Sequence, residues 1–319
     1  MATASTPNLS SYLSERYAAI KEKYPGEGRR KWRLHVAEEF WKLQSEEKER
    51  KTLNSTSIST DDADFENDDD PSDCYSSEEI PGFGILIRTD FSNEEAWKNL
   101  LSKVKEGEAE FAATVGEDED ESMEDDAALP SGSGSGSNSI TDKAPKSDAQ
   151  MEVENNDGQE EDEEEDEDDG SLPPIFTTVD PPPALQNRLN GISNLTALRL
   201  FNDVNIRRAP RPPPGTKRIK PGNRLIDLDG WQEIYEGKRL WLYDAKSNTD
   251  GCVRVVSPQS ASSPYGTATA DSWRARVSHI CELQVNIASG AMSIDFGGLD
   301  KYDYAERVRN LEEADKTSL

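Results

Sequence analysis

Residues 82–104 read GFGILIRTDFSNEEAWKNLLSKV, and this stretch decides the fold expected for the chain. The continuous apolar run from Ile85 to Ile87 is typical of a buried strand. After a turn, Ser92 is followed three residues later by Glu95, which is the pattern of a capping box at the start of a helix. Apolar residues then recur at helical spacing, namely Trp97, Leu100, Leu101 and Val104. The stretch therefore predicts a strand followed by an amphipathic helix.

Further strand and helix patterns follow after residue 171. PIFTTVD (174–180) alternates as a strand does. PPPALQNRLNG (181–191) has proline in its first turn and Gly191 at its end, as a short helix does. Three later segments are predicted as strands, with EGKR (236–239) as a hairpin turn: LTALRLFNDVNIRR (195–208), RLIDLDGWQEIYEGKRLWLYDAK (224–246) and CVRVVS (252–257).

The last part of the chain is expected to contain a helix, a strand and a terminal helix. Asp271 precedes Trp273, Val277, Ile280 and Cys281 at helical spacing, and AMSIDFGGLDKYDY (291–304) reads as a strand and turn. We therefore expect an α+β fold, with one mixed α+β domain built from residues 81–114 and 171–310 and a tail at 311–319.

The charge of the chain is concentrated in two segments. The 319 residues carry a net charge of −28 and are only 33% hydrophobic. Residues 54–80 contain 10 acidic and no basic residues, while 115–170 contain 23 acidic and 2 basic residues, including an unbroken acidic run from Glu160 to Asp169. Such segments cannot bury enough apolar surface to offset their ordering entropy. We predict a disordered acidic linker at 54–80 and a long disordered acidic insertion at 115–170.

The first 53 residues form a small basic and helical segment. Tyr12, Ile20 and Tyr24, and then Trp32, Val36, Phe40 and Leu43, recur at helical spacings on either side of Pro25-Gly26. The order of Tyr12, IK (20–21), YPG (24–26), FWK (40–42) and SEEK (45–48) resembles the HMG-box family of DNA-bending proteins. That resemblance implies an L of three helices whose basic residues contact DNA phosphates, here Arg29, Arg30, Lys31 and Arg33.

The resemblance to an HMG box is partial. The third helix of that family is long and basic, whereas this chain turns to LNSTSISTDDAD (53–64) after two turns at most. The segment is therefore interpreted as an incomplete or divergent HMG-box-like module at 1–53. The alternative is an amphipathic helical hairpin that docks on a protein partner or back on the main domain.

A second basic stretch, RRAPRPPPGTKRIK (207–220), lies in a run from Asn205 to Leu225 that contains no acidic residue. Its two basic clusters and proline spacer resemble a bipartite nuclear import signal, with Arg207, Arg208, Lys217, Arg218 and Lys220 as the candidate contacts to an import receptor. The same stretch is also compatible with nucleic-acid binding, with contact to the acidic insertion, or with a charged surface loop.

The long acidic run resembles the acidic tracts of chromatin proteins. Multivalent carboxylates compete with DNA phosphate for lysine and arginine, so an intramolecular tract can mask a basic module. A tract that only increases solubility is the alternative interpretation.

Residues typical of catalytic or metal sites are scarce. His35 and His279 lie in no zinc-ligand or nucleophile pattern, and Asp227 and Asp229 in LIDLDGW are more typical of a turn than of a Mg²⁺ site. Cys74, Cys252 and Cys281 have no disulfide or metal spacing, which favours a reducing compartment. The sequence also has no run of 18 apolar residues. We predict no catalytic residue, no cofactor, no metal and no membrane association.

The main domain carries a resemblance of its own. ILIRTDFSNEEAW (85–97) and NIASGAMSIDFGGLDKYD (286–303) are similar to the two ends of an uncharacterised domain family of bacteria and fungi with an RTDFS-type box. The resemblance covers most of 81–304 and implies a fold but no chemistry. Arg88, Asp90, Asp295 and Phe296 are expected at strand edges, where a charged pair closes the sheet.

Taken together, these patterns predict a non-enzymatic, nuclear protein, with the cytoplasm as the alternative location. The N-terminal helices are expected to contact DNA or a chromatin protein, and the acidic tracts to regulate access to them by electrostatic competition. One alternative is a protein-interaction scaffold without nucleic-acid binding, and another is an enzyme with an unrecognised site.

Overall fold

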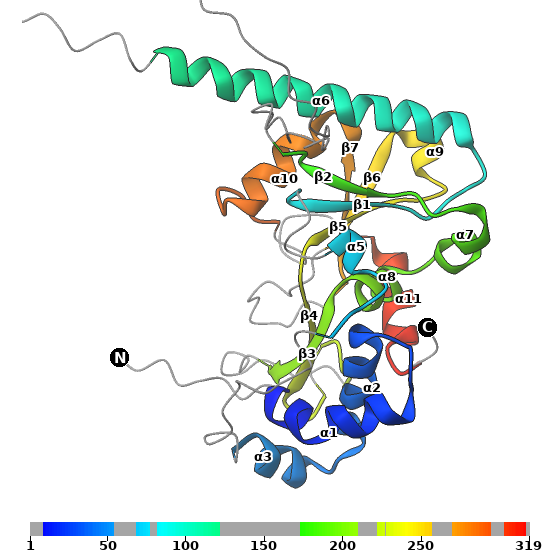
Figure 1. The fold of residues 1–319 in the computed structure, drawn as a ribbon, viewed down its shortest axis with the longest axis vertical. Coiled ribbons are helices and arrows are strands. Elements are labelled where there is room, and N and C mark those ends of the chain that lie inside the picture. The colour runs from blue at the N-terminus through cyan, green and yellow to red at the C-terminus, as the bar shows by residue number, and fades with distance from the viewer. Residues whose placement is uncertain are drawn as a thin grey trace, which may run out of the picture. The chain divides into compact units, whose positions relative to one another are not determined.

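The structure is a computed structural model that describes residues 9–53, 68–76, 82–121, 173–209, 222–226, 228–256, 270–294 and 303–316. Helices and strands mix in an α+β fold (Figure 1). The chain divides into two compact units, one formed by residues 1–113 and 173–319 and the other by residues 114–172. Every strand that the structure describes belongs to the first unit.

A five-stranded sheet with the order β2-β1-β5-β6-β7 forms the centre of the first unit. Strand β1 is parallel to β2 on one side and to β5 on the other. Strand β6 is antiparallel to its neighbours β5 and β7. The strands are β1 (Gly84–Arg88), β2 (Phe176–Val179), β5 (Arg239–Tyr243), β6 (Cys252–Val256) and β7 (Ser272–Arg276). The strands expected at 85–87, 174–180 and 252–257 are thereby confirmed.

Both faces of this sheet are covered, as the continuous apolar run predicts. All five residues of β1 are buried. Ile85 and Ile87 point into one core together with Leu240 of β5, while Leu86 points into a second core together with Trp241. Successive side chains of a strand face opposite sides, so the three consecutive apolar residues of β1 need a packed layer on each side of the sheet.

Helices α6 (Glu94–Glu121) and α10 (Ile280–Ala288) cover the second core. Trp97, Leu100 and Val104 of α6 are buried there, which confirms the amphipathic helix expected after β1. The helix begins one residue later than the expected capping box. Asn93 caps it by accepting a hydrogen bond from the backbone N–H of Ala96 at 3.0 Å, while the Ser92 hydroxyl donates to Asp90.

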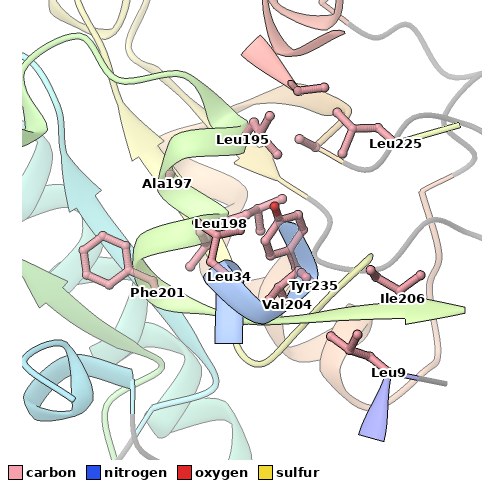
Figure 2. Packing of buried hydrophobic residues seen from close by; sticks show 14 of the residues in the cluster. Leu9, Leu34, Leu195, Ala197, Leu198, Phe201, Val204, Ile206, Leu225 and Tyr235 are labelled. Atoms are coloured by element: carbon pink, nitrogen blue, oxygen red, sulfur yellow. The ribbon is translucent and has the colours of Figure 1, made fainter. Parts of the chain in front are cut away.

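Three N-terminal helices, α1 (Ser10–Lys23), α2 (Arg29–Lys42) and α3 (Ser45–Leu53), precede the sheet. Leu9 and Leu34 pack among Leu198 of α8 (Asn194–Phe201), Val204 and Ile206 (Figure 2). The first core thus continues without a break from the N-terminal helices to β1, and residue 53 is not the end of a separate domain. The structure agrees with the alternative in which the helical hairpin docks on the main domain.

Helix α8 (Asn194–Phe201) corrects the strand expected over 195–208. Only the second half of the segment 195–208 is a strand, β3 (Asp203–Arg208). The Ser193 hydroxyl caps α8 by accepting a hydrogen bond from the Thr196 backbone N–H at 3.0 Å. The helix buries Leu195, Leu198 and Phe201, which are three residues apart. A serine cap with this spacing favours a helix over a strand.

The prediction of a hairpin turn at 236–239 is also wrong. Strand β4 (Trp231–Glu236) pairs with β3 in a separate two-stranded sheet, whereas β5 pairs with β1 and β6. In the first part of the segment 224–246, residues 224–226 and 229–230 form turns, and Leu228 forms only an isolated bridge with Trp231. Gly237, with φ of 142°, carries the chain between the two sheets, and a Cβ there would lie 2.5 Å from the Asn202 amide nitrogen. Only glycine fits this close approach.

The C-terminal part differs from expectation in its boundaries. Trp273 lies in β7, and the helix expected from Asp271 starts after a 3₁₀ turn at Val277–His279. Residues 295–302, most of the expected strand at 291–304, lie outside the described residues. The terminal helix α11 (Tyr304–Glu313) is confirmed and continues beyond residue 310 to a fully buried Ala314, so a tail does not begin at 311.

Part of the expected acidic linker has a defined structure. Residues 68–76 include the short helix α5 (Asp73–Ser76), and Tyr75 packs against the first core. The rest of the linker and residues 122–170 of the insertion lie outside the described residues. The remaining short helices are α7 (Pro183–Leu189), which was expected, and α9 (Ser247–Asp250).

We predict that Phe40→Ala lowers the free energy of unfolding by about 3–5 kcal/mol. Phe40 has no exposed surface, and its ring centroid lies 5.4 Å from that of Trp231 in β4. Denaturant titration followed by both tryptophan fluorescence and far-UV circular dichroism should give one shared transition, shifted to lower denaturant.

The matched control is Phe83→Ala, because Phe83 is 52% exposed and the change should cost less than about 1 kcal/mol. Two separate transitions, with the second unchanged by Phe40→Ala, would show that the N-terminal helices fold independently of the sheet.

Candidate functional site

An acidic segment lies across the basic N-terminal helices. We call residues 68–75, with the sequence DDDPSDCY, the strap. At its start, the Asp68 carboxylate accepts hydrogen bonds from the Tyr17 hydroxyl at 3.0 Å and from Lys21 Nζ at 2.6 Å. Burial and the contact with Asp68 raise the pKa of the Tyr17 hydroxyl above its usual value. The strap is thereby fixed to α1.

Asp70 holds the first turn of α2. Its carboxylate accepts from the backbone N–H of Arg30 at 2.8 Å and from the guanidinium of the same residue at 2.8 Å. The backbone N–H of Arg29 reaches the Asp69 carbonyl at 3.4 Å. The residue before α2 is Gly28, which has no side chain for capping, so the strap satisfies amide groups that would otherwise lack partners.

Gly28 lets the strap approach the helix closely. A Cβ at this position would lie 2.6 Å from Pro71 Cδ and 2.9 Å from an Asp70 carboxylate oxygen. Its φ of 94° and ψ of 162° also belong to a region that side chains other than hydrogen rarely tolerate. Backbone and side chain of the strap therefore fit the helix only because position 28 is glycine.

Arg29 lies between carboxylates of two segments. It donates to Asp73 of the strap at 2.9 Å and to Asp203 of β3 at 2.7 Å. Burial alone lowers the pKa of Arg29, but Asp203 and Asp73 outweigh it and raise the pKa. Arg33 lies 3.7 Å from Asp203 and donates to the Val204 carbonyl. The two arginines link the strap, α2 and β3.

Three of the four residues expected to contact DNA phosphates therefore bind carboxylates of this chain. The side chains of Arg29, Arg30 and Arg33 are only 12%, 6% and 10% exposed. Lys31 is half-buried on the same helix. The arginine groups lie at the interface of α2 with the strap and β3, where carboxylates of the same chain occupy them.

The expected import residues are only partly described. Arg207 and Arg208 belong to β3, and the second of these pairs with Glu49 of α3 and lies 4.4 Å above the ring of Trp231. The structure does not describe Lys217, Arg218 and Lys220. The first of the two basic clusters is therefore part of the folded unit.

A second charged cluster lies deep in the first core. Glu233 of β4 has no exposed surface and accepts from Trp41 Nε1 at 3.0 Å and from the Tyr235 hydroxyl at 2.5 Å. Arg199 and Arg224 lie 3.5 Å and 3.3 Å from its carboxylate. Burial raises the pKa of Glu233, but the two arginines outweigh it and the pKa is lowered. The cluster stabilises the assembly of α2, α8 and β4.

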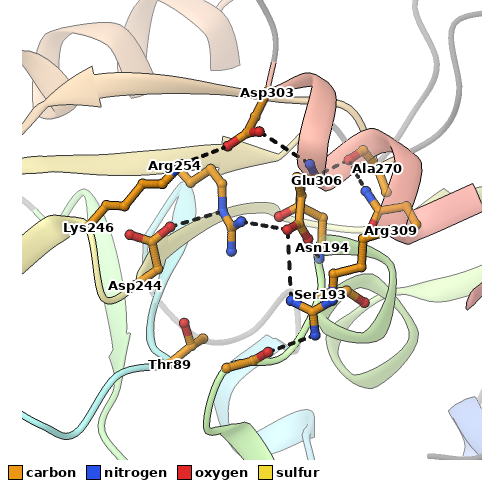
Figure 3. A network of polar contacts seen from close by, with 12 residues as sticks. Thr89, Ser193, Asn194, Asp244, Lys246, Arg254, Ala270, Asp303, Glu306 and Arg309 are labelled. Carbon is orange, nitrogen blue, oxygen red and sulfur yellow. Dashed lines mark hydrogen bonds and ion pairs between the residues drawn. The ribbon is translucent and has the colours of Figure 1, made fainter.

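A third cluster joins α11 to the rest of the unit (Figure 3). Arg254 of β6 lies 3.6 Å from Asp244 and 3.0 Å from Glu306, and Glu306 accepts from the backbone N–H of Asn194 at 2.8 Å. Asn194 and Asn310 both donate to the carbonyl of Ala270, which has a left-handed φ of 76°. These contacts hold the start of α8 and α11 against the sheet.

Arg88, at the end of β1, is one of the residues expected near a charged pair at a strand edge. Arg88 binds Glu94 at 2.7 Å and Asp180, at the end of β2, at 3.3 Å. Trp97 also donates to Asp180 at 2.9 Å. Asp90 accepts from Ser92 and Asn248, while Asp295 and Phe296 lie outside the described residues. Arg88 thus joins β1, β2 and the start of α6.

The structure describes three of the four residues considered for catalysis, and they lie in different elements: His35 in α2, His279 in the 3₁₀ turn and Asp229 in the turn before β4. His35 bonds Glu27 at 2.8 Å and stacks on Tyr24, and His279 is exposed. Asp229 lies in a turn with φ of 52°, and Asp227 is outside the described residues. Across the parts of the chain that the structure describes, no group of three or more His, Cys, Asp or Glu side chains could hold a metal ion.

Comparisons with known proteins add no family to these observations. No family model, no curated protein and no solved structure matches the chain. Within the described ranges, no helix is both long and apolar enough to cross a membrane.

The strap is a structural feature that the composition of the chain does not reveal. Its acidity resembles that of the residues around it, but Pro71 and Ser72 favour a turn and Tyr75 offers an aromatic anchor. Within it, the Asp70 carboxylate accepts from the Ser72 backbone N–H at 2.9 Å, and Asp73 accepts from that of Asp70 at 3.0 Å. These turn signals distinguish the strap from the unbroken acidic run at 160–169.

We predict that Asp70→Asn destabilises the protein by about 3 kcal/mol, because it leaves a buried guanidinium without its anionic partner. The Asp70 and Arg30 side chains are 5% and 6% exposed. Asp69→Asn is the matched control, since Asp69 is exposed and contributes only its backbone carbonyl. Chemical denaturation measures both, and equal effects of the two changes would contradict the contact.

Asp271 provides a prediction on pH. Its side chain is 3% exposed and binds Arg307 at 3.1 Å. Burial, partly offset by Arg307, raises its pKa to about 6. A carboxyl whose pKa is higher in the folded state contributes stability below its unfolded pKa, and that stability is lost as pH rises through about 6.

We therefore expect Asp271→Asn to become more stable relative to the wild type between pH 4 and pH 7.5, by up to about 3 kcal/mol. Unfolding free energies measured across this range test the change. Asp315→Asn, at an exposed position just after α11, controls for the loss of one carboxylate. A difference between Asp271→Asn and the wild type that stays constant with pH would refute the assignment.

Proposed function

We propose that this chain is a non-enzymatic interaction protein that binds basic polypeptides through its acidic insertion, residues 115–170. The observation that carries the proposal is the ion pairing of Arg29, Arg30 and Arg33 with aspartates of the same chain. Aspartates of the same chain thereby neutralise the charges of these three arginines of α2. The largest unbalanced charge of the chain is then that of the insertion, with 23 acidic and 2 basic residues.

The chemistry of the insertion favours a lysine- and arginine-rich partner, of the kind found in histone tails. A run of carboxylates such as Glu160–Asp169 attracts cationic segments over the screening length of the solution and needs no fixed geometry. Carboxylates of this kind compete with DNA phosphate for the same side chains. The partner class is therefore a basic protein segment and not a nucleic acid.

The fold supports this role because the domain closes without the insertion. Strands β1 and β2, on either side of it in the sequence, pair directly in parallel, with Gly84 opposite Phe176 and Ile87 opposite Val179. Trp97 and Leu100 fix the first part of α6 to the sheet. A partner can therefore engage residues 115–170 without disturbing the pairing of the sheet.

We further propose a nuclear location, carried by an import receptor that reads Lys217, Arg218 and Lys220, with the cytoplasm as the alternative. Arg207 and Arg208 are less suited to this role, because they are part of β3. DNA contact through α2 is the competing function, and it requires the strap to leave the helix first.

The test measures binding of the full-length protein to a fluorescent lysine-rich peptide and to a short DNA duplex at several salt concentrations. We expect the peptide to bind, with affinity that falls as salt rises, and the duplex to bind at least tenfold more weakly. Replacing residues 115–170 by a neutral Gly/Ser/Asn sequence of equal length should reduce peptide binding at least tenfold.

Deletion of the neutral tract SGSGSGSNS (131–139) is the matched control, because it shortens the insertion without removing charge. It should leave peptide binding unchanged. Tight duplex binding that is lost on Lys31→Ala, together with weak peptide binding, would favour the DNA-binding function instead.

A further inference from the structure

We propose that the surface beneath the strap is a binding site for acidic peptides of a partner protein, and that the strap is its intramolecular occupant. The site consists of the side of α1 near Lys21, the first turn of α2 and the ring of Phe201. It is separate from the acidic insertion and does not depend on the function proposed for it.

The first element of recognition is a binding position for one carboxylate at the start of α2. Asp70 occupies it with both oxygens, since one accepts from the Arg30 backbone N–H and the other from the Arg30 guanidinium. A carboxylate bound by a charged donor and a helix amide together is held more strongly than by either alone.

A second carboxylate and an aromatic ring follow at fixed spacing. Asp73 accepts from Arg29 at 2.9 Å and lies 2.7 Å from Arg30. Two residues later the Tyr75 ring packs edge to face against Phe201, with centroids 6.5 Å apart. The chemistry recognised is therefore a peptide of the pattern Asp-Pro-x-Asp-x-Tyr, with further acidic residues before it.

The strap binds the helices in the manner of a ligand. The carboxylates of Asp68, Asp70 and Asp73 bind donors of α1 and α2, and the described strap residues take no part in the ladders of either sheet. In the sequence, residues 54–67 separate the strap from α3 and residues 77–81 separate it from Gly82. Exchange with a peptide in trans therefore leaves both sheets paired.

The geometry favours a peptide over a nucleic acid. Asp70 is buried to 5% exposure of its side chain, and Pro71 lies within 2.6 Å of where a Cβ of residue 28 would be. A peptide turn is narrow enough to place a carboxylate at this depth. The phosphates of a DNA duplex belong to a wide and rigid double helix, which does not fit there. The strap also balances the charge of the site, because Asp68, Asp70 and Asp73 face Lys21, Arg29 and Arg30.

A tethered occupant competes strongly with a partner. An occupant that belongs to the same chain is present at an effective concentration on the order of millimolar, so a free peptide binds the intact chain far more weakly than a chain without the strap. The strap therefore restricts the site to partners that present the motif at high local concentration or in several copies.

The test uses the full chain with residues 68–75 replaced by alternating Gly and Ser, and a fluorescent peptide with the sequence of residues 67–76, NDDDPSDCYS. Fluorescence polarisation should show at least tenfold tighter binding to this variant than to the intact chain. A peptide carrying Asn in place of both Asp70 and Asp73 should bind at least tenfold more weakly.

A glycine pair controls for the location of the site. In the strap-replaced chain, Gly28→Ala should abolish peptide binding, because its Cβ occupies the path of Pro71 and Asp70. Gly26→Ala should leave binding intact, since Gly26 also has positive φ, 81°, but no atom within 4 Å of its Cβ. Equal binding by the two variants, or no binding by a folded strap-replaced chain, overturns the proposal.

A second measurement covers the case in which the strap-replaced chain does not fold. Protease sites placed within 54–67 and 77–81 of the otherwise intact chain release the strap as a noncovalent fragment. Displacement of the fragment by added peptide, with retained circular dichroism, supports the proposal. Unfolding upon loss of the fragment, or equal displacement by a DNA duplex, overturns it.

Discussion

The fully buried carboxylate of Glu233 is the constraint on which the first unit depends. An ionised carboxylate without solvent costs several kcal/mol unless every oxygen is matched by donors and positive charge. Those donors come from segments far apart in the sequence: Trp41 of α2, Arg199 of α8 and Arg224 before β4. The carboxylate is therefore stabilised only when the N-terminal helices, α8 and the two-stranded sheet are assembled together.

Arg199 extends this dependence to the C-terminal end. Its guanidinium also donates to the backbone carbonyls of Ala314 at 2.8 Å and Lys316 at 2.7 Å. The first helices and the last one thus contact the same central network. This arrangement explains why a segment that resembles a separate DNA-binding module in sequence packs as a layer of the α+β domain, and why α11 continues into buried Ala314.

The parts of the fold that could be predicted are those with strong local patterns. The Ile85–Ile87 run and the spacing of Trp97, Leu100 and Val104 were sufficient for β1 and α6. In LTALRLF, by contrast, apolar residues stand at both alternating and helical spacings, so periodicity alone does not separate strand from helix. The junction at Gly237 looks like a hairpin turn, because nothing local indicates that β5 pairs with β1 instead of β4.

The candidate site could be predicted only in its composition. Charge counts locate the basic helix and the acidic linker, but the contact between Arg29 and Asp203 joins residues 174 positions apart and follows from the tertiary fold. Charge counts also treat all carboxylates alike. Asp70 is only 5% exposed in its ion pair, so dissolved salt screens it little, whereas a long run of like charges acts over the Debye length, about 8 Å in physiological salt. The same residue type therefore fixes the strap by short contacts and, in the proposed binding of basic partners by the insertion, acts over a longer and salt-sensitive range.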